Sequence, residues 1–493
     1  MKLVYYARFF TAFPLVLLGL PPCHALVAQS AIQEVDVAII GGGLAGLSAA
    51  KALAAANKSF AILEARDRVG GRVLKANVLG KHAEELGAEY VGPTQDQVLA
   101  LAAELGLPTY KTYTTGYSTF YRNGTVHHYQ DQLGGIPPVP ISSLVELALF
   151  MNEVNTLASE IDLKAPWNSP SATVLDSTTL ETYVNSKIST ADSRVLLDVA
   201  IPAILSTELN EPSLLYALWC IAAAGNETGA GTINRLIGVD GGAQDSRVHG
   251  GTQLLAIRLA EKLGTDNIFL NAPVRKVKLE KSRYLVSSDT VVISAKDVVV
   301  AMSPPLVSRI IFDPLLPAGR DQLNQRMPMG SIGKAIAIFP RAWWRVQGLN
   351  GAGVSDTGVI RVTYDNSPAD GSFGALMGFI EADEMRKLDN ASEEEVKRQV
   401  KQSFTNLFGP HVETATDILI QRWDLEEFSR GGPAAFMPPG VLTQYGSHLR
   451  APCGRIHFAG TETSLRWIGY MDGAISSGAR VAREILDNDC CND

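Results

Sequence analysis

A cluster of glycines near the N-terminal end of the chain has the spacing needed to hold a phosphate. Gly41, Gly43 and Gly46 occupy the positions of a G-x-G-x-x-G fingerprint in the run GGGLAG. In such a turn the first glycine permits the sharp bend, the second lets a pyrophosphate approach the backbone, and the third lets a helix pack closely on a strand. Leu44 and Ala45, in the same turn, are expected to contact the ligand as well.

The segments around the glycines match the elements that such a turn requires. The run VDVAII at 35–40 predicts a strand, and LSAAKALAAAN at 47–57 predicts a helix whose free N–H groups and dipole favour negative charge. A second predicted strand, SFAILEA, carries Glu64, placed where an acid accepts hydrogen bonds from a ribose. Together these features predict a Rossmann-like dinucleotide site, and the acid favours an unphosphorylated ribose.

The segment after Glu64 points to the kind of dinucleotide. It reads ARDRVGGRV, in which Gly70 and Gly71 let the backbone pass close to a ligand and Arg66 and Arg72 supply cations. The stretch from Glu64 to Arg72 is similar to the second flavin-binding segment of the monoamine and polyamine oxidases, so FAD is the expected cofactor. The residues expected to contact it here are Glu64, Ala65, Arg66, Gly71 and Arg72.

The resemblance continues along the chain to residue 486. It includes ELGAEYVGPTQ (85–95), HGGTQLLAIRLAEKLG (249–264), and NAPVRKVKL, where Val274 matches the position whose backbone meets the adenine. Its most specific part is RIHFAGTETSLRWIGYMDGAISSGARVAREIL (455–486), which resembles the family's second flavin clamp. The resemblance implies that Thr461 reaches the phosphate and ribityl region and that the Met471 N–H meets the pyrimidine carbonyl. The other residues expected in this clamp are Gly460, Glu462, Gly469 and Tyr470, with Trp467 nearby.

Two residues are expected to act in catalysis. The resemblance implies that Lys334 holds a water near the flavin N5 and that Tyr470 is one of two aromatic residues flanking the substrate amine. A buried lysine is costly without a partner, and an aromatic face suits a positive charge developing on nitrogen. The cofactor supplies the difficult chemistry, so no catalytic triad is expected.

The sequence departs from the family pattern at two neighbouring positions. Gly432 stands where some relatives carry the cysteine that bonds to the flavin, and Pro433 stands where the second aromatic would be. We therefore expect FAD to be bound non-covalently and the aromatic cage to be incomplete. Phe436, or an aromatic residue from the other domain, is expected to complete it.

The resemblance implies an FAD-dependent amine oxidase, in which a hydride passes from an amine α-carbon to the flavin. O₂ is then reduced to hydrogen peroxide, and the imine hydrolyses to a carbonyl compound and an amine or ammonia. One alternative is an L-amino-acid oxidase, which would need an arginine for the carboxylate, or a biosynthetic flavin oxidase acting on a C–N bond of a larger metabolite. Another is a flavin-binding protein without turnover. The sequence leaves the particular amine and the oligomeric state open.

The 493 residues are enough for two packed units. The expected fold is α/β, with a Rossmann-like FAD-binding domain at 32–115, 240–310 and 425–488. An inserted α+β substrate domain is expected at 116–239 and 311–424, with the active site between the two.

Composition and residue spacing exclude several other functions. The formal net charge is -8 and no Lys/Arg cluster is present, so no nucleic-acid partner is expected. Neither the histidines nor the cysteines have metal-ligand spacing, and no disulfide framework is expected. The cysteines are Cys23, Cys220, Cys453, Cys490 and Cys491.

The first 28 residues resemble a cleavable secretion signal. Lys2 and Arg8 precede an apolar stretch from Phe9 to Leu20, which prolines make too short to span a bilayer. A secreted protein without a membrane anchor is therefore expected. Glycosylation is expected if the host modifies the Asn-x-Ser/Thr sites, which are Asn57, Asn123, Asn226 and Asn390.

Overall fold

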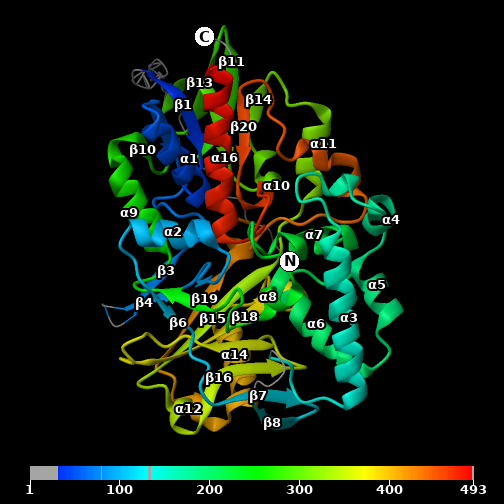
Figure 1. The fold of residues 1–493 in the computed structure, drawn as a ribbon. Helices are drawn as coiled ribbons and strands as arrows, with labels where there is room; N and C mark the ends of the chain where they lie inside the picture. The colour runs from blue at the N-terminus through cyan, green and yellow to red at the C-terminus, as the bar shows by residue number, and fades with distance from the viewer. Residues whose placement is uncertain (1–31, 79, 81, 131–134, 491–493) are drawn as a thin grey trace, which may run out of the picture.

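The computed structural model describes residues 32–78, 80, 82–130 and 135–490. The expected secretion signal at 1–28 therefore lies outside the described residues. Within them, two large sheets lie one above the other, and a group of helices packs beside them (Figure 1).

The first sheet combines strands from the beginning, middle and end of the chain. β1 (Gln33–Ile40) pairs in parallel with β2 (Phe60–Leu63) and with β13 (Val292–Ala301). β13 in turn pairs in parallel with β20 (Ile456–Ala459). The remaining strands of this sheet are β10 (Ile268–Phe269), β11 (Val274–Glu280), β12 (Arg283–Ser288) and β14 (Ile311–Asp313). Only β14 falls in a segment expected to belong to the substrate domain.

Two helices from opposite ends of the chain cross on one face of this sheet. They are α1 (Leu44–Ala55) and α16 (Met471–Cys490), which Figure 1 shows in blue and red. A Cβ on Gly478 would lie 2.1 Å from the carbonyl oxygen of Ala45. The small residue Gly478 therefore lets the two helices approach closely, and this places the starts of both helices beside the same cavity.

The second sheet is largely antiparallel and is contributed by the two stretches assigned to the substrate domain. Its strand order is β19, β15, β18, β17, β16, β7 and β8. Their bounds are β19 (Asp417–Arg422), β15 (Ile332–Phe339), β18 (Gly374–Glu381), β17 (Val362–Asp365), β16 (Leu349–Ser355), β7 (Tyr117–Arg122) and β8 (Thr125–Tyr129). Side chains alternate between the two faces of β15, so Ala335 and Ala337 pack under α14 (Glu393–Phe408), whereas Lys334 points to the opposite face.

The helical part of the substrate region forms its own apolar core. At its centre is α7 (Leu214–Ala223), all of whose residues are buried. It is contacted by α3 (Ile141–Ser159), α4 (Ala172–Ser177) and α5 (Leu180–Lys187), and α3 in turn packs against α6 (Ala191–Leu205) and α8 (Ile233–Ile237). The C-terminal end of α6 reaches the cavity between the sheets.

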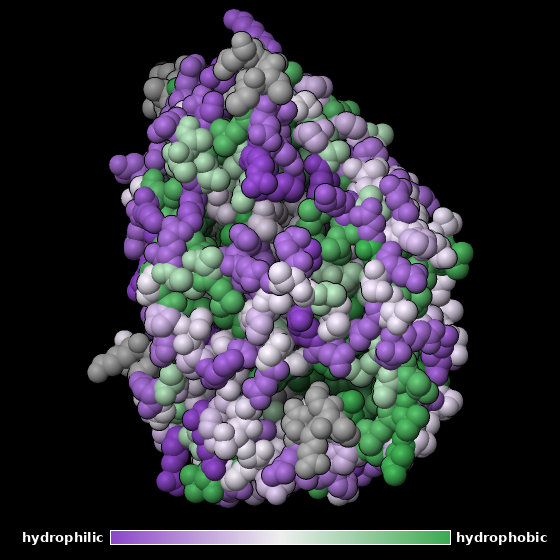
Figure 2. Space-filling model, in the orientation of Figure 1, coloured by the Kyte–Doolittle hydropathy of each residue, from purple (hydrophilic) through white to green (hydrophobic). Residues whose placement is uncertain are grey.

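The visible surface mixes polar and apolar residues, with apolar side chains gathered toward the lower end of α3 (Figure 2). Ile141, Val145 and Leu149 are exposed there at a spacing of four residues, so they share one side of the helix. None of the helices in the described part of the chain is long and apolar enough to cross a membrane.

Candidate active site

One large cavity extends from the glycine turn to the second sheet. The residues expected to hold the cofactor that line this cavity are Gly41, Gly43, Leu44, Ala45, Glu64, Ala65, Arg66, Gly71, Arg72, Val274, Gly460, Thr461, Gly469, Tyr470 and Met471. Lys334 lines it as well, from β15. The sequence segments separated by hundreds of residues therefore meet at one site, as the resemblance implies.

The glycine turn forms a cradle that is suited to a phosphate group. A Cβ added to Gly43 would find no atom nearer than 3.9 Å, so the open space lies directly over this residue. Gly43 caps α1, but no side chain caps the helix and no acid occupies its first turn. The free N–H groups at this helix end therefore face the cavity, and an anion fits them.

The other two glycines are required by backbone packing. A Cβ on Gly46 would lie 2.0 Å from the carbonyl oxygen of Gly41, and a Cβ on Gly41 would lie 2.6 Å from that of Ala301. Gly41 also has a φ of +105°, which L side chains rarely adopt. Both positions therefore keep α1 against the sheet.

Glu64 is buried at the end of β2 and holds the turn in shape. Its Oε2 accepts a hydrogen bond of 2.6 Å from the Gly42 N–H, and its Oε1 accepts one of 2.9 Å from the Arg66 N–H. The Arg66 side chain donates to Ser429 Oγ at 2.9 Å and lies 3.4 Å from Glu426 Oε2. The carboxylate at the ribose position is therefore fixed before any ligand arrives.

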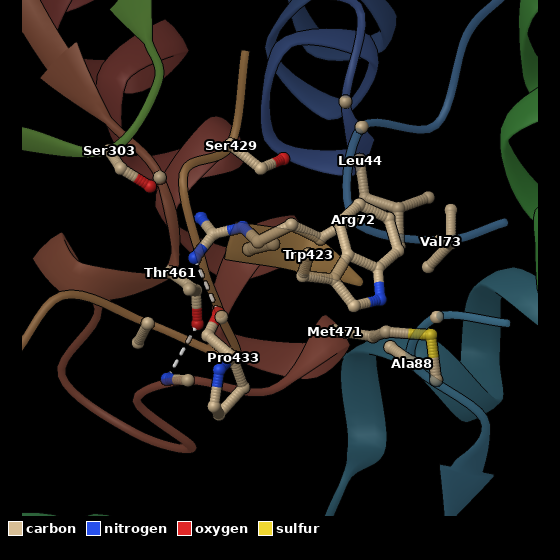
Figure 3. A pocket seen from close by; sticks show the side chains of 18 of the residues that line it. Leu44, Arg72, Val73, Ala88, Ser303, Trp423, Ser429, Pro433, Thr461 and Met471 are labelled. Carbon is tan, nitrogen blue, oxygen red and sulfur yellow. Dashed lines mark hydrogen bonds between the residues drawn. The ribbon is translucent and has the colours of Figure 1, made fainter. Parts of the chain in front are cut away.

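Arg72, whose side chain Figure 3 shows at the cavity wall, joins the two expected flavin-binding segments through Glu462. Arg72 Nη1 donates to Glu462 Oε1 at 2.8 Å, and Nη2 donates to Oε2 at 3.2 Å. Glu462 also accepts from Ser303 Oγ and from the Ala435 N–H. Burial alone would raise the pKa of Glu462, but Arg72 and these donors lower it overall. Glu462, expected to contact the cofactor, thus lies behind the residues that line the cavity. Its carboxylate neutralises the charge of Arg72.

The C-terminal clamp offers backbone groups to a ligand. Thr461 Oγ1 accepts a hydrogen bond of 2.8 Å from the Gly469 N–H and donates one of 2.9 Å to the Tyr470 carbonyl. Its hydroxyl therefore shapes the turn. Met471 begins α16, where helix N–H groups lack helical partners, and it lines the cavity.

Lys334 is buried and has a counter-ion that sequence reasoning missed. Its Nζ forms an ion pair with Glu89 Oε2 and donates to the Gly87 carbonyl at 3.1 Å. Its side chain is 3% exposed, which excludes the alternative of a strand-edge lysine reaching solvent. Glu89 was present in the segment ELGAEYVGPTQ, and the need of a buried lysine for a carboxylate was the available signal.

Aromatic side chains from the C-terminal turn and from the second sheet line the substrate end of the cavity. Tyr470 packs edge-on against Trp467, with ring centroids 4.9 Å apart. Tyr364 and Phe379 reach the cavity from the second sheet, and their rings contact each other edge-on. Phe436, one expected partner of Tyr470, is instead buried in the helical core. The other expected partner of Tyr470 was an aromatic residue of the substrate region, and Tyr364 and Phe379 from that region face the cavity.

Two tryptophans lie at or near the cavity. Trp467, expected near the cofactor, packs behind the cavity-lining Tyr470 and donates from Nε1 to the Thr94 carbonyl. Trp423, which has no expected role in the site, lines the cavity and donates to the Leu86 carbonyl at 2.9 Å. Hydrophobicity alone does not distinguish the two environments.

The position of the family's flavin-linking cysteine is a cavity-lining glycine, Gly432. Cys220 also lines the cavity, and burial raises the pKa of its thiol to about 12, so it is a protonated, apolar wall group. Cys220 and Cys453 are both free. In the described part of the chain, no group of three or more potential ligands could hold a metal ion.

A mixed sheet with a glycine cradle after its parallel strand β1, closed by helix α16 and facing a buried lysine among aromatic residues, defines a flavin-dependent oxidase. The chain belongs to the flavin containing amine oxidoreductase family, whose profile matches residues 44–486. It uses FAD to oxidise amines.

Similar proteins cover nearly the whole chain. AofH of Mycobacterium tuberculosis H37Rv, assigned as a flavin-containing monoamine oxidase, is 38% identical over 452 residues, covering 92% of this chain and 96% of AofH. Horse flavin-containing amine oxidase A is 36% identical over 469 residues, covering 93% and 86%. The structure of putrescine oxidase bound to putrescine matches with a TM-score of 0.87 at 33% identity, covering 92% of this chain and all of that one.

Proposed function

We propose that this protein oxidises small amines with an apolar or aromatic substituent. The supporting observation is the composition of the substrate end of the cavity. Its lining includes Leu205, Tyr216, Cys220, Ile332, Tyr364, Phe379, Ile468 and Tyr470. Lys334 is the charged group on this wall, and Glu89 balances it.

An amino-acid substrate fits this cavity less well. A substrate carboxylate needs a free cation, preferably an arginine. Among the described residues that line the cavity, the arginines lie at the cofactor end, where Arg66 and Arg72 already contact carboxylates. Amine oxidation is therefore favoured over amino-acid oxidation.

The residues of the chain orient the substrate while FAD, when bound, accepts the hydride and passes electrons to O₂ to give hydrogen peroxide. Tyr470, with Tyr364 and Phe379, would present aromatic faces to the amine. The apolar lining would exclude water and favour the neutral amine. Lys334 would hold a water near N5.

We propose further that FAD is bound without a covalent link. Gly43 and the N-terminus of α1 would receive the pyrophosphate, Glu64 the ribose and the Met471 N–H the pyrimidine ring. Gly432 offers no thiol for a bond. Acid precipitation of the purified protein should leave the yellow colour in the supernatant, and colour retained in the pellet would contradict this proposal.

The central test is a peroxide-coupled screen of apolar monoamines, diamines, polyamines and amino acids. Apolar monoamines should give the highest kcat/KM. A preference for amino acids would contradict the proposed substrate class, and a flavin-loaded protein without turnover on any amine would support the non-catalytic alternative.

Secretion and glycosylation rest on the sequence of residues 1–28 and on the acceptor sites. Asn57, Asn123 and Asn390 are exposed, whereas the Asn226 amide is held by Asp96 and accepts hydrogen bonds from Thr228 and Gly229. Asn226 should therefore be modified least. N-terminal sequencing and glycosidase treatment of protein from its native host would test both proposals, and an intact Met1 would contradict cleavage.

A further inference from the structure

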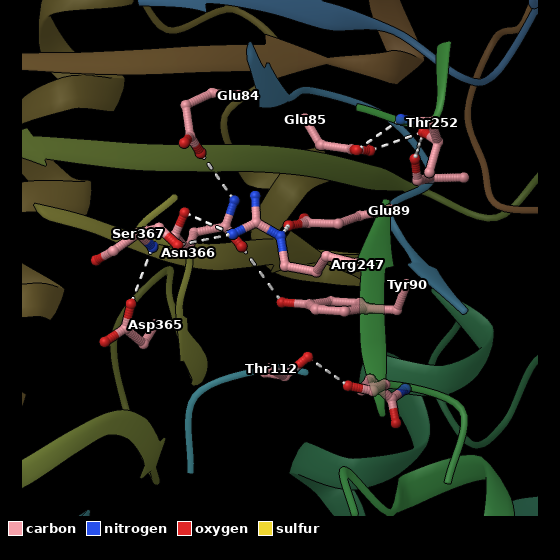
Figure 4. Close-up of polar contacts among 12 residues, drawn as sticks. Glu84, Glu85, Glu89, Tyr90, Thr112, Arg247, Thr252, Asp365, Asn366 and Ser367 are labelled. Atoms are coloured by element: carbon pink, nitrogen blue, oxygen red, sulfur yellow. Dashed lines mark hydrogen bonds and ion pairs between the residues drawn. The ribbon is translucent and has the colours of Figure 1, made fainter. Parts of the chain in front are cut away.

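A buried cluster of charges, which includes Glu89 and Arg247 (Figure 4), forms an ion pair with Lys334. Its central member is Glu89, whose Oε2 contacts Lys334 and whose Oε1 lies 2.6 Å from Arg247 Nε. The side chains of Glu89 and Arg247 are 1% and 3% exposed. One carboxylate therefore bridges two buried cations, using one oxygen for each.

Arg247 is fixed on several sides. Its Nη1 donates to the carbonyl of Asn366 at 2.7 Å and to that of Ser367 at 3.2 Å. Its guanidinium lies 5.4 Å from the centre of the Tyr110 ring. Because Arg247 is fixed in this way, Glu89 is held at one oxygen, and its other oxygen is directed at Lys334.

The neighbouring acids do not share this role. Glu84 accepts a hydrogen bond of 2.9 Å from Asn366 Nδ2, and Glu85 accepts two of 2.7 Å from Thr252. Burial raises the pKa of Glu84 to about 7 and that of Glu85 to about 8. Among the described residues, Glu89 is the only carboxylate that forms an ion pair with Lys334.

We propose that Glu89, anchored by Arg247, is a positioning residue that holds Lys334 as a charged group facing the flavin side of the cavity. This inference rests on the proposed role of Lys334 beside N5. An ammonium at this depth is strongly disfavoured without a counter-ion. A cation near a group that gains electrons also favours its reduction, and this effect is strong where water is excluded.

Removing the carboxylate should therefore alter the bound flavin itself. In Glu89→Gln, Lys334 loses both its counter-ion and its orientation. We expect a lower midpoint potential for bound FAD, weaker formation of the sulfite adduct, and a kcat reduced roughly 10- to 100-fold. The KM for the amine should change little, because Glu89 acts through Lys334.

Glu84→Gln is the matched control, since it removes a buried carboxyl of the same cluster that forms no ion pair with Lys334. Lys334→Met should reproduce the effects of Glu89→Gln on potential, sulfite affinity and kcat. The double variant Glu89→Gln/Lys334→Met should then have a kcat and a flavin potential no lower than those of Lys334→Met alone, because both substitutions remove the same interaction. Glu89→Asp, which keeps the charge, should restore part of the wild-type potential.

The outcomes separate this inference from the proposed function. If Lys334→Met leaves kcat and potential unchanged, the proposed role of Lys334 fails. If Lys334→Met is impaired but Glu89→Gln matches Glu84→Gln in potential and sulfite affinity, the inference about Glu89 is overturned. If Glu89→Gln does not bind FAD, the potential and sulfite affinity of Glu89→Asp are measured instead. A potential restored toward the wild-type value in Glu89→Asp would then support the positioning role of Glu89.

Discussion

Arg72 and Glu462 are 390 positions apart in the chain, yet they form a two-point ion pair behind the cavity wall. The Glu462 carboxylate is almost fully buried, whereas Arg72 is about one quarter exposed. This pair joins the segment after β2 to the turn that follows β20. This ion pair therefore joins the two halves of the proposed flavin site.

Breaking this pair should destabilise the protein. Glu462→Gln is expected to lower the free energy of unfolding by about 3 kcal/mol, because buried ion pairs lose most when one partner is removed. Glu426→Gln removes the partly exposed partner of Arg66 and should cost about 0–1 kcal/mol. Urea titration of the two apoproteins would measure the difference, and equal losses would contradict the importance of the buried pair.

Gly43 in the glycine cradle and Gly478 on α16 should respond differently to an added methyl group. Gly43→Ala places a Cβ in open space, so apoprotein stability should stay near wild type while FAD affinity falls. Gly478→Ala places a Cβ against the Ala45 carbonyl, so it should destabilise the apoprotein by about 1–3 kcal/mol or more. Thermal melting with and without FAD would distinguish them. An unaltered FAD affinity in Gly43→Ala would argue against a phosphate over this residue.

Tyr470 should contribute through its ring and not through its hydroxyl. Tyr470→Phe is expected to keep kcat/KM within about twofold, whereas Tyr470→Ala should lower it about tenfold through loss of the aromatic face. Steady-state peroxide production with the best substrate would measure both values. A large loss in Tyr470→Phe would indicate a chemical role for the hydroxyl.

Glu381 should make the protein less stable at alkaline pH. This carboxyl is fully buried at the end of β18, its Oε1 has no hydrogen-bond partner, and burial raises its pKa from 4.5 to about 8. The folded state therefore binds a proton that the unfolded state releases above pH 4.5. Stability should fall as pH rises from about 4.5 to 8 by roughly a few kcal/mol and then level off.

Glu381→Gln should remove this fall in the free energy of unfolding with pH. The variant should therefore be more stable than wild type at pH 9 and not at pH 4. Glu413→Gln, an exposed carboxylate elsewhere, should follow the wild-type curve. Urea unfolding across this pH range would test the assignment, and parallel curves for Glu381→Gln and wild type would refute it.

The sequence was most informative where function depends on local spacing. The positions of Gly43 and Glu64 in the site could be predicted because the strand, turn and helix around them are contiguous in the chain. Both residues line the cavity as expected. The C-terminal segment could also be assigned to the flavin site from its sequence, and its small residues allow α16 to approach α1. The resemblance also predicted the family, the cofactor and the fold correctly.

Contacts between distant segments were the part that sequence reasoning missed. Glu89 and Arg247 are ordinary charged residues in their own segments, and only the fold brings them behind Lys334. The aromatic residues of the substrate end were equally difficult to assign. Tyr364 and Phe379 owe their places to the pairing of β17 with β18, and no local pattern contains that pairing.

The parallel pairing of β20 with β13, followed by α16, sets the order in which this enzyme can mature. The nucleotide cradle begins at β1 but is completed only by β20 and α16, more than 400 residues further along the chain. A nascent or truncated chain without these two elements therefore lacks half of the contacts to the flavin. Flavin binding should thus require that β20 and α16 have been synthesised, and a yellow molecule should contain both.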